Sequence, residues 1–261
     1  MRSELISVPG DPARPDEDYA SLGLPASGQG GSLVVLDGVT PPSTGYACLH
    51  SVPWFTARLG GSLHELSVSR RDLALPEVLA HAIAHTADAH RATCDLSHPR
   101  TPQATVVLAR WSRESVEYLI LSDSALLVES PAGVVTPLLD DRLSRVPRAT
   151  LTSHTATDAT LRNKEGGFFT AAADPSVASR AVTGTLPRSE VRALAALTDG
   201  ATRWTDKFHE GDWTDLFALV RKEGGQALID RVRVLELADV ERAFLGRSKQ
   251  HDDATVAYVE L

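Results

Sequence analysis

The stretch "LVVLDGVT", from Leu33 to Thr40, places a charged residue directly after a run of apolar ones. The run follows the glycine-rich turn "GQGG" and predicts a buried strand over Leu33–Leu36. Asp37 then stands at the end of this strand, and Gly38 comes next. A carboxylate at the end of a buried strand is costly unless it is paired or binds a metal ion. The stretch therefore raises the possibility of a metal site at a strand end.

The same order recurs along the chain. "LAALTDGAT" leads into Asp199, "YLILSDSALLV" leads into Asp123, and "HDDATVAYVEL" sets Asp252 and Asp253 before a last apolar strand. Carboxylates from several strand ends, together with the acidic triplet 16–18, are the oxygen ligands that Mg²⁺ or Mn²⁺ prefers. Asp-Gly is also a common turn dipeptide, so each aspartate alone is more often a turn residue. Its recurrence after apolar runs favours the metal site.

Composition narrows the class of protein. The chain has 261 residues, 43% of them hydrophobic, which is enough for a full core. A net charge of −8 argues against a nucleic-acid partner, because phosphates need a basic surface. No apolar segment is typical of a signal peptide or a membrane span, so we expect a soluble, cytoplasmic protein without a membrane partner. Cys48 and Cys94 are expected to be free thiols, and the oligomeric state stays open.

The pattern of elements predicts an α+β fold in one domain, residues 1–261. A strand at 4–8 precedes the strand Leu33–Leu36, and two amphipathic helices follow at 53–66 and 75–93. Short β-branched segments between 103 and 139 predict an antiparallel meander. Further strands are expected at 166–174, 181–186 and 191–197, then helices at 212–223 and 225–241 and a strand at 254–261.

The ordered motifs "DEDYA", "VLDGVT", "TPQATVVLAR", "LILSDSALLV", "LAALTDGATRW" and "HDDATVAYVEL" resemble those of the PP2C family of metal-dependent phosphatases. The resemblance runs from residue 14 to the C-terminus. The motif sequences are most similar to an actinobacterial branch of the family. It implies a four-layer αββα sandwich, in which helix pairs flank two central antiparallel sheets. It also implies a site for two Mn²⁺ or Mg²⁺ ions at one end.

The resemblance assigns roles residue by residue. It implies that Asp37 bridges both metals, that the Gly38 carbonyl is a ligand, and that Asp199 and Asp252 are further ligands. Glu17 or Asp18 would hold metal-bound water. Asp253 would contact the ligands rather than the metal. Asp123 matches the position for a third, weaker ion. Arg14 resembles the phosphate-binding arginine, although it is equally read as a solvated turn charge.

Such a site would hydrolyse a phosphomonoester with a water activated by two metals, so no protein nucleophile is required. The leaving alkoxide still needs a proton, and His50 is the candidate general acid, with a structural role as the alternative. His81 and His85 form an HxxxH pair on a predicted helix. No glutamate or third ligand completes a zinc motif there, so we expect them on a solvent-facing flank.

Departures from the family pattern concern the third metal position and two loops around the site. Ser122 replaces the usual glycine before Asp123, and Ala125 replaces a common arginine, which puts the third metal in question. The loops 39–50 and 140–165 differ most from the pattern and are expected to shape specificity. The second loop offers a basic rim or, alternatively, an ordinary solvated helix face; its basic residues are Arg142, Arg145, Arg148, Arg162 and Lys164.

Three hypotheses about function follow. The first is a phosphatase that acts on phosphoserine or phosphothreonine proteins, and the second is a phosphatase for a small phosphorylated metabolite such as a sugar or nucleotide. The third is a catalytically weak module that binds phosphorylated partners. The oxygen ligands expected from Asp37, Asp199 and Asp252 are all present, which favours an enzyme. A metal-dependent hydrolase of another fold would lack the ordered motifs.

Overall fold

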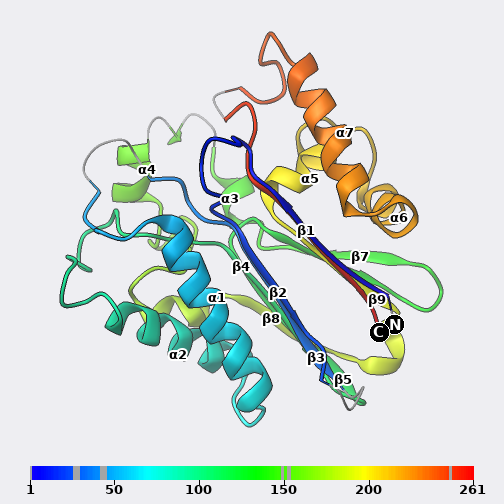
Figure 1. The fold of residues 1–261 in the computed structure, drawn as a ribbon, viewed down its shortest axis with the longest axis horizontal. Coiled ribbons are helices and arrows are strands. Elements are labelled where there is room, and N and C mark those ends of the chain that lie inside the picture. The colour runs from blue at the N-terminus through cyan, green and yellow to red at the C-terminus, as the bar shows by residue number, and fades with distance from the viewer. Residues whose placement is uncertain (1, 26–29, 42–45, 148–149, 152–153, 247–248) are drawn as a thin grey trace.

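The computed structural model describes residues 2–25, 30–41, 46–147, 150–151, 154–246 and 249–261. Its strands form two five-stranded antiparallel sheets (Figure 1). The first sheet has the strand order β1 (Ser3–Val8), β10 (Ala254–Glu260), β9 (Ala193–Leu197), β6 (Ala125–Glu129), β7 (Val135–Leu138). The second has the order β2 (Tyr19–Gly23), β3 (Gly31–Leu36), β4 (Val106–Trp111), β5 (Ser115–Leu121), β8 (Val182–Pro187).

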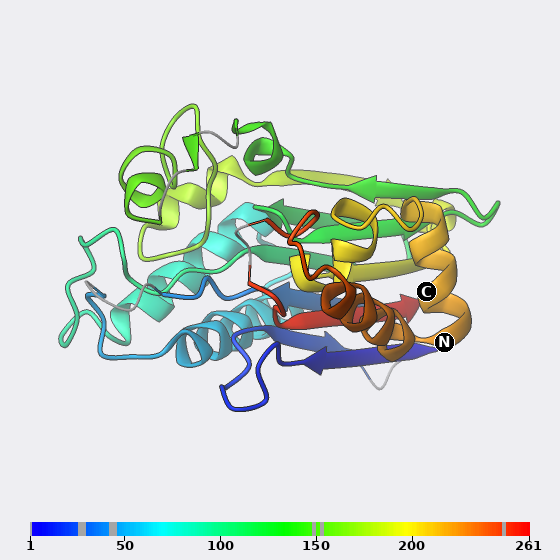
Figure 2. The same cartoon turned by 90° about the horizontal axis from the view of Figure 1, so that it is seen from above.

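Two groups of helices cover the outer faces of the sheets. The pair α1 (Val52–Ser69) and α2 (Leu75–Asp88) packs on the second sheet. The group α5 (Asp199–Asp206), α6 (Trp213–Glu223) and α7 (Gly225–Ala238) packs on the first. Figures 1 and 2 show the two groups on opposite sides of the strands. Shorter elements complete the described chain: α3 (Arg142–Arg145), α4 (His154–Thr160), η2 (Pro175–Arg180) and η3 (Arg188–Glu190).

Successive side chains of a central strand pack into different cores, which produces the layers of the sandwich. In β3, Val34 and Leu36 contact the core beneath α1 and α2, whereas Leu33 and Val35 lie in the core between the sheets. Successive side chains of a strand point to opposite faces, so a central strand with no polar face must be covered on both. All four of these side chains are fully buried. The predicted αββα sandwich is therefore confirmed.

The helix α1 begins at a defined cap. The Ser51 hydroxyl accepts a hydrogen bond from the Trp54 backbone N–H at 3.3 Å, and Pro53 occupies the first turn. Both features favour a helix start, because the first N–H groups have no partner within the helix. Phe55, Leu59 and Leu63 then fall on the buried face. Burying each such side chain contributes about 1.5–3 kcal/mol.

Two predicted elements differ from the structure. The meander does not continue past β5, since β5 pairs with β8 and β6 pairs with β9 in the other sheet. The chain crosses between sheets at 122–124, where Ser122 has a φ of 71°. The segment 166–174 forms only isolated bridges, including Ala104 with Ala171, rather than a strand. Its apolar residues fill the core beside α2 instead, as Phe169 and Ala171 do.

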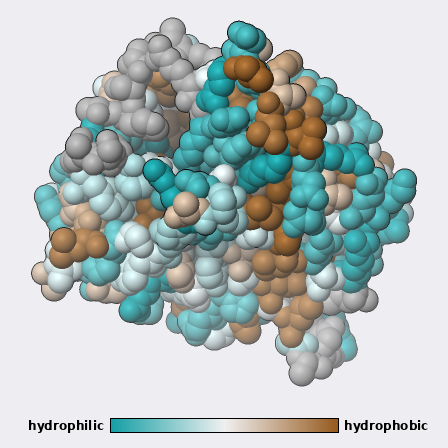
Figure 3. Space-filling model, turned by 45° about the horizontal axis from the view of Figure 1, so that its top comes forward, coloured by the Kyte–Doolittle hydropathy of each residue, from teal (hydrophilic) through white to brown (hydrophobic). Residues whose placement is uncertain are grey.

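The molecular surface is mostly hydrophilic in the view of Figure 3, and hydrophobic groups gather toward its right-hand half. Exposed apolar side chains of α7 and the segment after it are Val234, Leu237, Val240 and Phe244. Among the described residues, no helix combines the length and the apolar character that crossing a membrane requires.

Candidate metal centre

The register of the sheets brings several strand ends to one place. Tyr19 of β2 pairs with Leu36 of β3, so the next residues outward are Asp18 and Asp37. In the other sheet, Val256 of β10 pairs with Leu197 of β9, which sets the segment before β10 beside the start of α5. Residues far apart in sequence therefore reach one end of the sandwich through strand pairing.

Asp37 lies at the centre of a cluster of five carboxylates. Burial raises the pKa of Asp37 well above its usual range, and the charges of Asp199, Asp18, Asp252 and Asp123 raise it further. Burial alone raises the pKa of a carboxyl group, and nearby negative charges add to the rise. The structure thus gathers the aspartates that the sequence places at strand ends.

Asp199 is the first residue of α5 and faces the same cluster. Burial, followed by the charges of Asp252 and Asp123, raises the pKa of Asp199 to about 7. The guanidinium of Arg203 and a hydrogen bond with Asp37 act in the opposite direction. A group of buried carboxylates that repel one another is suited to bind cations.

Asp18 carries the clearest sign of a missing partner. Its Oδ2 accepts hydrogen bonds from the hydroxyls of Thr198 at 2.9 Å and Thr255 at 2.7 Å. Its Oδ1 is buried and has no hydrogen-bond partner in the structure. Buried carboxylate oxygens are almost always satisfied. An oxygen-only set of donors with one orphaned oxygen fits a hard divalent cation such as Mg²⁺ or Mn²⁺.

The two glycines that follow aspartates are places of close backbone approach. A Cβ atom added at Gly38 would lie 2.4 Å from the carbonyl oxygen of Glu17. A Cβ atom at Gly200 would lie 2.0 Å from the carbonyl oxygen of Asp253. Both glycines therefore allow the acidic segments to pack against each other, a requirement that the Asp-Gly dipeptide signalled.

Asp253 binds the backbone of the segment that carries the N-terminal acidic motif. Its two carboxylate oxygens accept hydrogen bonds from the backbone N–H groups of Gly10 at 2.7 Å and Glu17 at 2.8 Å. Carboxylate oxygens of Asp16, Asp18 and Asp253 all lie within 4.8 Å of one another. Sequence reasoning named Glu17 and Asp18 as candidates and passed over Asp16, although the triplet itself was visible.

Asp252 has two cationic partners that the sequence did not reveal. Its Oδ2 accepts from Arg203 at 2.9 Å, and its Oδ1 accepts from Lys249 at 2.7 Å. Arg203 is 2% exposed and also pairs with the fully buried Glu236 at 2.5 Å. Because Arg203 lies one helical turn after Asp199, it was detectable only once α5 was known to start there.

Asp123 follows a residue with an unusual backbone. Ser122 has a φ of 71°, in the region that favours glycine, and glycine is what the family pattern has at this position. Its N–H donates to Asp140 at 2.8 Å, and its hydroxyl donates to Asp123 at 3.1 Å. Asp140 and the serine hydroxyl thus hold the turn in place of the glycine.

The remaining candidates occupy other surroundings. Arg14 lies 3.6 Å from Asp11, and 75% of its side chain is exposed. His50 lies in a group with two cysteines and a second histidine rather than alone beside a carboxylate. His81 and His85 are exposed on α2, as predicted for a solvent-facing flank. The roles of Arg14 and His50 in catalysis stay predictions.

Three basic residues of the loop 140–165, Arg142, Arg145 and Arg162, are paired with acids. Arg142 makes two hydrogen bonds to Asp140, at 2.7 and 2.6 Å. Arg162 donates to Asp158 at 3.0 Å and lines a pocket. Arg148 lies outside the described residues. The walls of this pocket include Val39, Thr40, Tyr46, Arg100, Gln103 and Arg162.

Comparison with solved structures identifies the class of fold: the chain has the fold of PP2C-type bacterial serine/threonine phosphatases. Stp1 from Staphylococcus aureus superposes with a TM-score of 0.61 at 14% identity, covering 100% of this chain and 95% of that one. The Mycobacterium tuberculosis phosphatase PstP/Ppp gives 0.59 at 16% identity, covering 100% and 98%. The S. agalactiae serine/threonine phosphatase gives 0.62 at 13% identity, covering 100% and 99%.

By sequence alone, no family model and no curated protein matches the chain. The likeness to the solved structures is therefore one of fold rather than of overall sequence.

Proposed function

We propose that the chain is a Mn²⁺- or Mg²⁺-dependent phosphatase that hydrolyses phosphomonoesters. The observation that carries the proposal is the buried Asp37 surrounded by four further carboxylates. The fold of solved serine/threonine phosphatases supports it. Folds host many functions, so the weight lies on the donor set.

Asp37, Asp199 and Asp252 would hold the two principal ions, and Asp18 would offer its orphaned oxygen to them or to their water. Gly38 would contribute its carbonyl oxygen as a ligand. Glu17, like Asp18, would hold metal-bound water. Asp123 would take a third, weaker ion. Bound Mn²⁺ or Mg²⁺ would supply Lewis-acid polarisation of a phosphate oxygen and lower the pKa of a coordinated water.

The protein's own residues have separate tasks around this centre. Asp253 fixes the acidic segment through two backbone N–H groups, so the ligands stay in place. The Thr198 and Thr255 hydroxyls orient Asp18. Arg162 lines the pocket that Val39 and Thr40 also line, and it would meet the anionic ester there. A phosphorylated side chain of a protein and a small phosphate ester are both candidate substrates.

The decisive experiment is hydrolysis of p-nitrophenyl phosphate with Mn²⁺ or Mg²⁺ and its loss on chelation. Phosphopeptides, sugar phosphates and nucleoside monophosphates would then be compared as substrates. The Arg162→Ala variant tests the pocket, and Arg145→Ala is its control, because Arg145 is an exposed arginine paired with Asp141 outside the pocket. Hydrolysis of none of these esters would remove the proposal.

One observation favours a second candidate, a module that binds phosphorylated partners without turnover. Lys249 lies 2.7 Å from Asp252 and 3.9 Å from Glu17, and Arg203 pairs with Asp252 as well. These cations compete with metal at Asp252. Titration calorimetry with Mn²⁺ distinguishes the two: an enzyme binds Mn²⁺ and hydrolyses esters, whereas the module binds a phosphopeptide and leaves it intact. The actinobacterial branch and the cytoplasmic location stay predictions from the sequence.

A further inference from the structure

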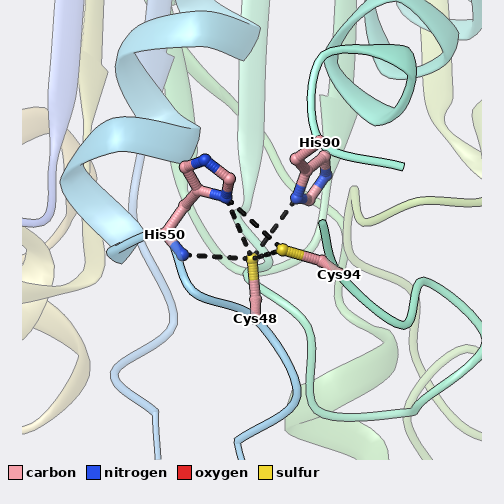
Figure 4. Close-up of side chains that lie close together, drawn as sticks. All are labelled: Cys48, His50, His90 and Cys94. Carbon is pink, nitrogen blue, oxygen red and sulfur yellow. Dashed lines mark hydrogen bonds between the residues drawn. The ribbon is translucent and has the colours of Figure 1, made fainter. Parts of the chain in front are cut away.

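A second cluster of metal-binding side chains lies apart from the carboxylates. Cys48 and Cys94 are separated by 46 residues in sequence, yet their sulfur atoms lie 3.2 Å apart. His50 and His90 complete the group, and all four donor atoms lie within 4.8 Å of one another. Figure 4 shows both thiols and both imidazoles pointing toward a common centre.

We propose that Cys48, His50, His90 and Cys94 form a structural Zn²⁺ site. Thiolate and imidazole are the ligands that zinc prefers, and Cys₂His₂ is a common structural set. The spacing Cys-x-His followed by His-x₃-Cys places two short ligand pairs on separate segments. Binding would displace the two thiol protons, because the thiolate is the ligand.

The sulfur–nitrogen distances match a tetrahedral site, whereas the sulfur–sulfur distance of 3.2 Å is shorter than the edge of about 3.8 Å between two zinc-bound sulfurs. Zinc bonds of about 2.3 Å to sulfur and about 2.0–2.1 Å to nitrogen give tetrahedral edges of about 3.3–3.8 Å. The Cys48 sulfur lies 3.6 Å from Nδ1 of His50 and 3.3 Å from Nδ1 of His90. The Cys94 sulfur lies 3.4 Å from Nδ1 of His50. Each histidine therefore presents the same nitrogen to the sulfurs.

The surroundings support thiolate ligands. The backbone N–H groups of Leu49 and His50 each donate to a cysteine sulfur, Cys94 and Cys48 respectively, at 3.4 Å. Hydrogen bonds of this kind orient metal ligands and stabilise their charge. Trp54 stacks on the His50 ring at a centroid distance of 4.0 Å and lies 5.2 Å from the His90 ring. Both imidazoles are thus held in orientation by packing.

A disulfide is the main alternative, since the two sulfurs are close. A disulfide requires a sulfur–sulfur distance near 2.05 Å, against the observed 3.2 Å. It would also leave unexplained why two histidine nitrogens face the same sulfurs. Of the two, only a metal ion uses all four donors.

The site joins two segments that lead to the pocket. Cys48 and His50 come just before α1, and His90 and Cys94 follow α2, so the ion would clamp one end of this helix pair. The same two segments are linked by hydrogen bonds from Ala47 N–H to the Arg100 carbonyl at 3.3 Å and from Val39 N–H to the Gln103 carbonyl at 2.9 Å. Four protein ligands leave no open position, so the zinc is structural and His50 has a ligand role in place of a general acid.

Metal analysis of the full-length, reduced protein tests the proposal. We expect one zinc per chain by plasma mass spectrometry after growth with zinc. The Cys48→Ser/Cys94→Ser variant should bind at least about tenfold less zinc. Two controls should keep it: Asp37→Asn, which alters only the carboxylate centre, and His85→Ala, which removes an exposed histidine of α2. Because the carboxylate centre can also take up zinc, the double cysteine variant is tested in an Asp37→Asn background as well, and one zinc per chain retained there would overturn the site.

A measurement on the unmodified chain covers the case in which the cysteine variant fails to fold. Protein prepared with Co²⁺ in place of Zn²⁺ should show sulfur-to-cobalt charge-transfer absorption and the visible bands of a tetrahedral ion. Titration of the zinc protein with a mercurial should release one zinc as two thiols react. A reduced wild-type chain without zinc, or a mass lower by two hydrogens from a Cys48–Cys94 disulfide, would overturn the proposal.

Discussion

Replacing Asp199 with asparagine should have opposite effects on stability and on activity. Asp199 is the first residue of α5, and burial together with the charges of Asp252 and Asp123 raises its pKa to about 7. Asparagine has nearly the same shape and carries no charge. In metal-free protein the substitution removes electrostatic strain. In metal-loaded protein it removes a ligand.

The size of the effect follows from the shift. A rise from 3.8 to about 7 corresponds to about 4 kcal/mol of lost stability once the group is fully ionised. The pKa of Asp199 is higher in the folded state than in the unfolded state. The wild type is therefore at full stability below the unfolded pKa of 3.8, and it loses free energy of unfolding as the pH rises through about 7. The penalty that asparagine removes should therefore be about 2–3 kcal/mol larger at pH 8 than at pH 5. For a chain of this length, 4 kcal/mol is about 7 °C in Tm.

Thermal unfolding after chelation measures the gain. The variant and the wild type are compared at pH 5 and pH 8, with Asp230→Asn as a control because Asp230 is an exposed aspartate of α7. We expect Asp199→Asn to raise Tm by several degrees at pH 8 and by less at pH 5. With saturating Mn²⁺ the order should reverse, because only the wild type retains the full ligand set.

Two results would refute this reasoning. An equal Tm for both proteins at pH 8 without metal would show that Asp199 is not strained by its neighbours. Wild-type turnover of p-nitrophenyl phosphate by the variant would show that Asp199 is not needed to hold the metals. Either result would separate the acidic cluster from the proposed activity.

Three further substitutions test the structure from other directions. Asp37→Asn should lower kcat/KM by at least about 100-fold with Mn²⁺, and steady-state assays showing a change below tenfold would contradict its central position. Ser122→Gly should raise the free energy of unfolding by up to about 1 kcal/mol, since Ser122 has a φ of 71°; a fall in denaturant midpoint would mean that its hydroxyl bond matters more. Arg203→Met should cost about 3–5 kcal/mol, because Glu236 would be left buried with fewer cationic partners; urea unfolding that is unchanged would argue against the buried pair.

The sequence predicted the layers because apolar periodicity is a local property that burial enforces. The strand over Leu33–Leu36 and the helices α1 and α2 lie where the pattern placed them. The acidic residues were visible for the same reason, since each follows or precedes a buried strand. Asp37 and Asp199 could thus be named before their neighbours were known.

Other features depend on contacts that no local pattern encodes. The break in the meander at Ser122 follows from a positive φ and from Asp140, which is 18 residues further along. The partnership of Asp252 with Arg203 crosses 49 residues. The Cys–His cluster was missed because the two cysteines were judged by their separation from each other. The informative signal was the histidine near each of them, two residues after Cys48 and four before Cys94.

The two candidate metal sites would select different ions by their donor atoms. The carboxylate cluster around Asp37 offers only oxygen, which favours hard cations such as Mg²⁺ and Mn²⁺. The Cys48–Cys94 cluster offers sulfur and imidazole nitrogen, which favour zinc. Oxygen sites generally bind zinc more tightly than manganese, so zinc that escaped the second cluster would compete at the first. The cysteine–histidine cluster would thus hold zinc, while the carboxylate cluster would suit ions that prefer oxygen ligands.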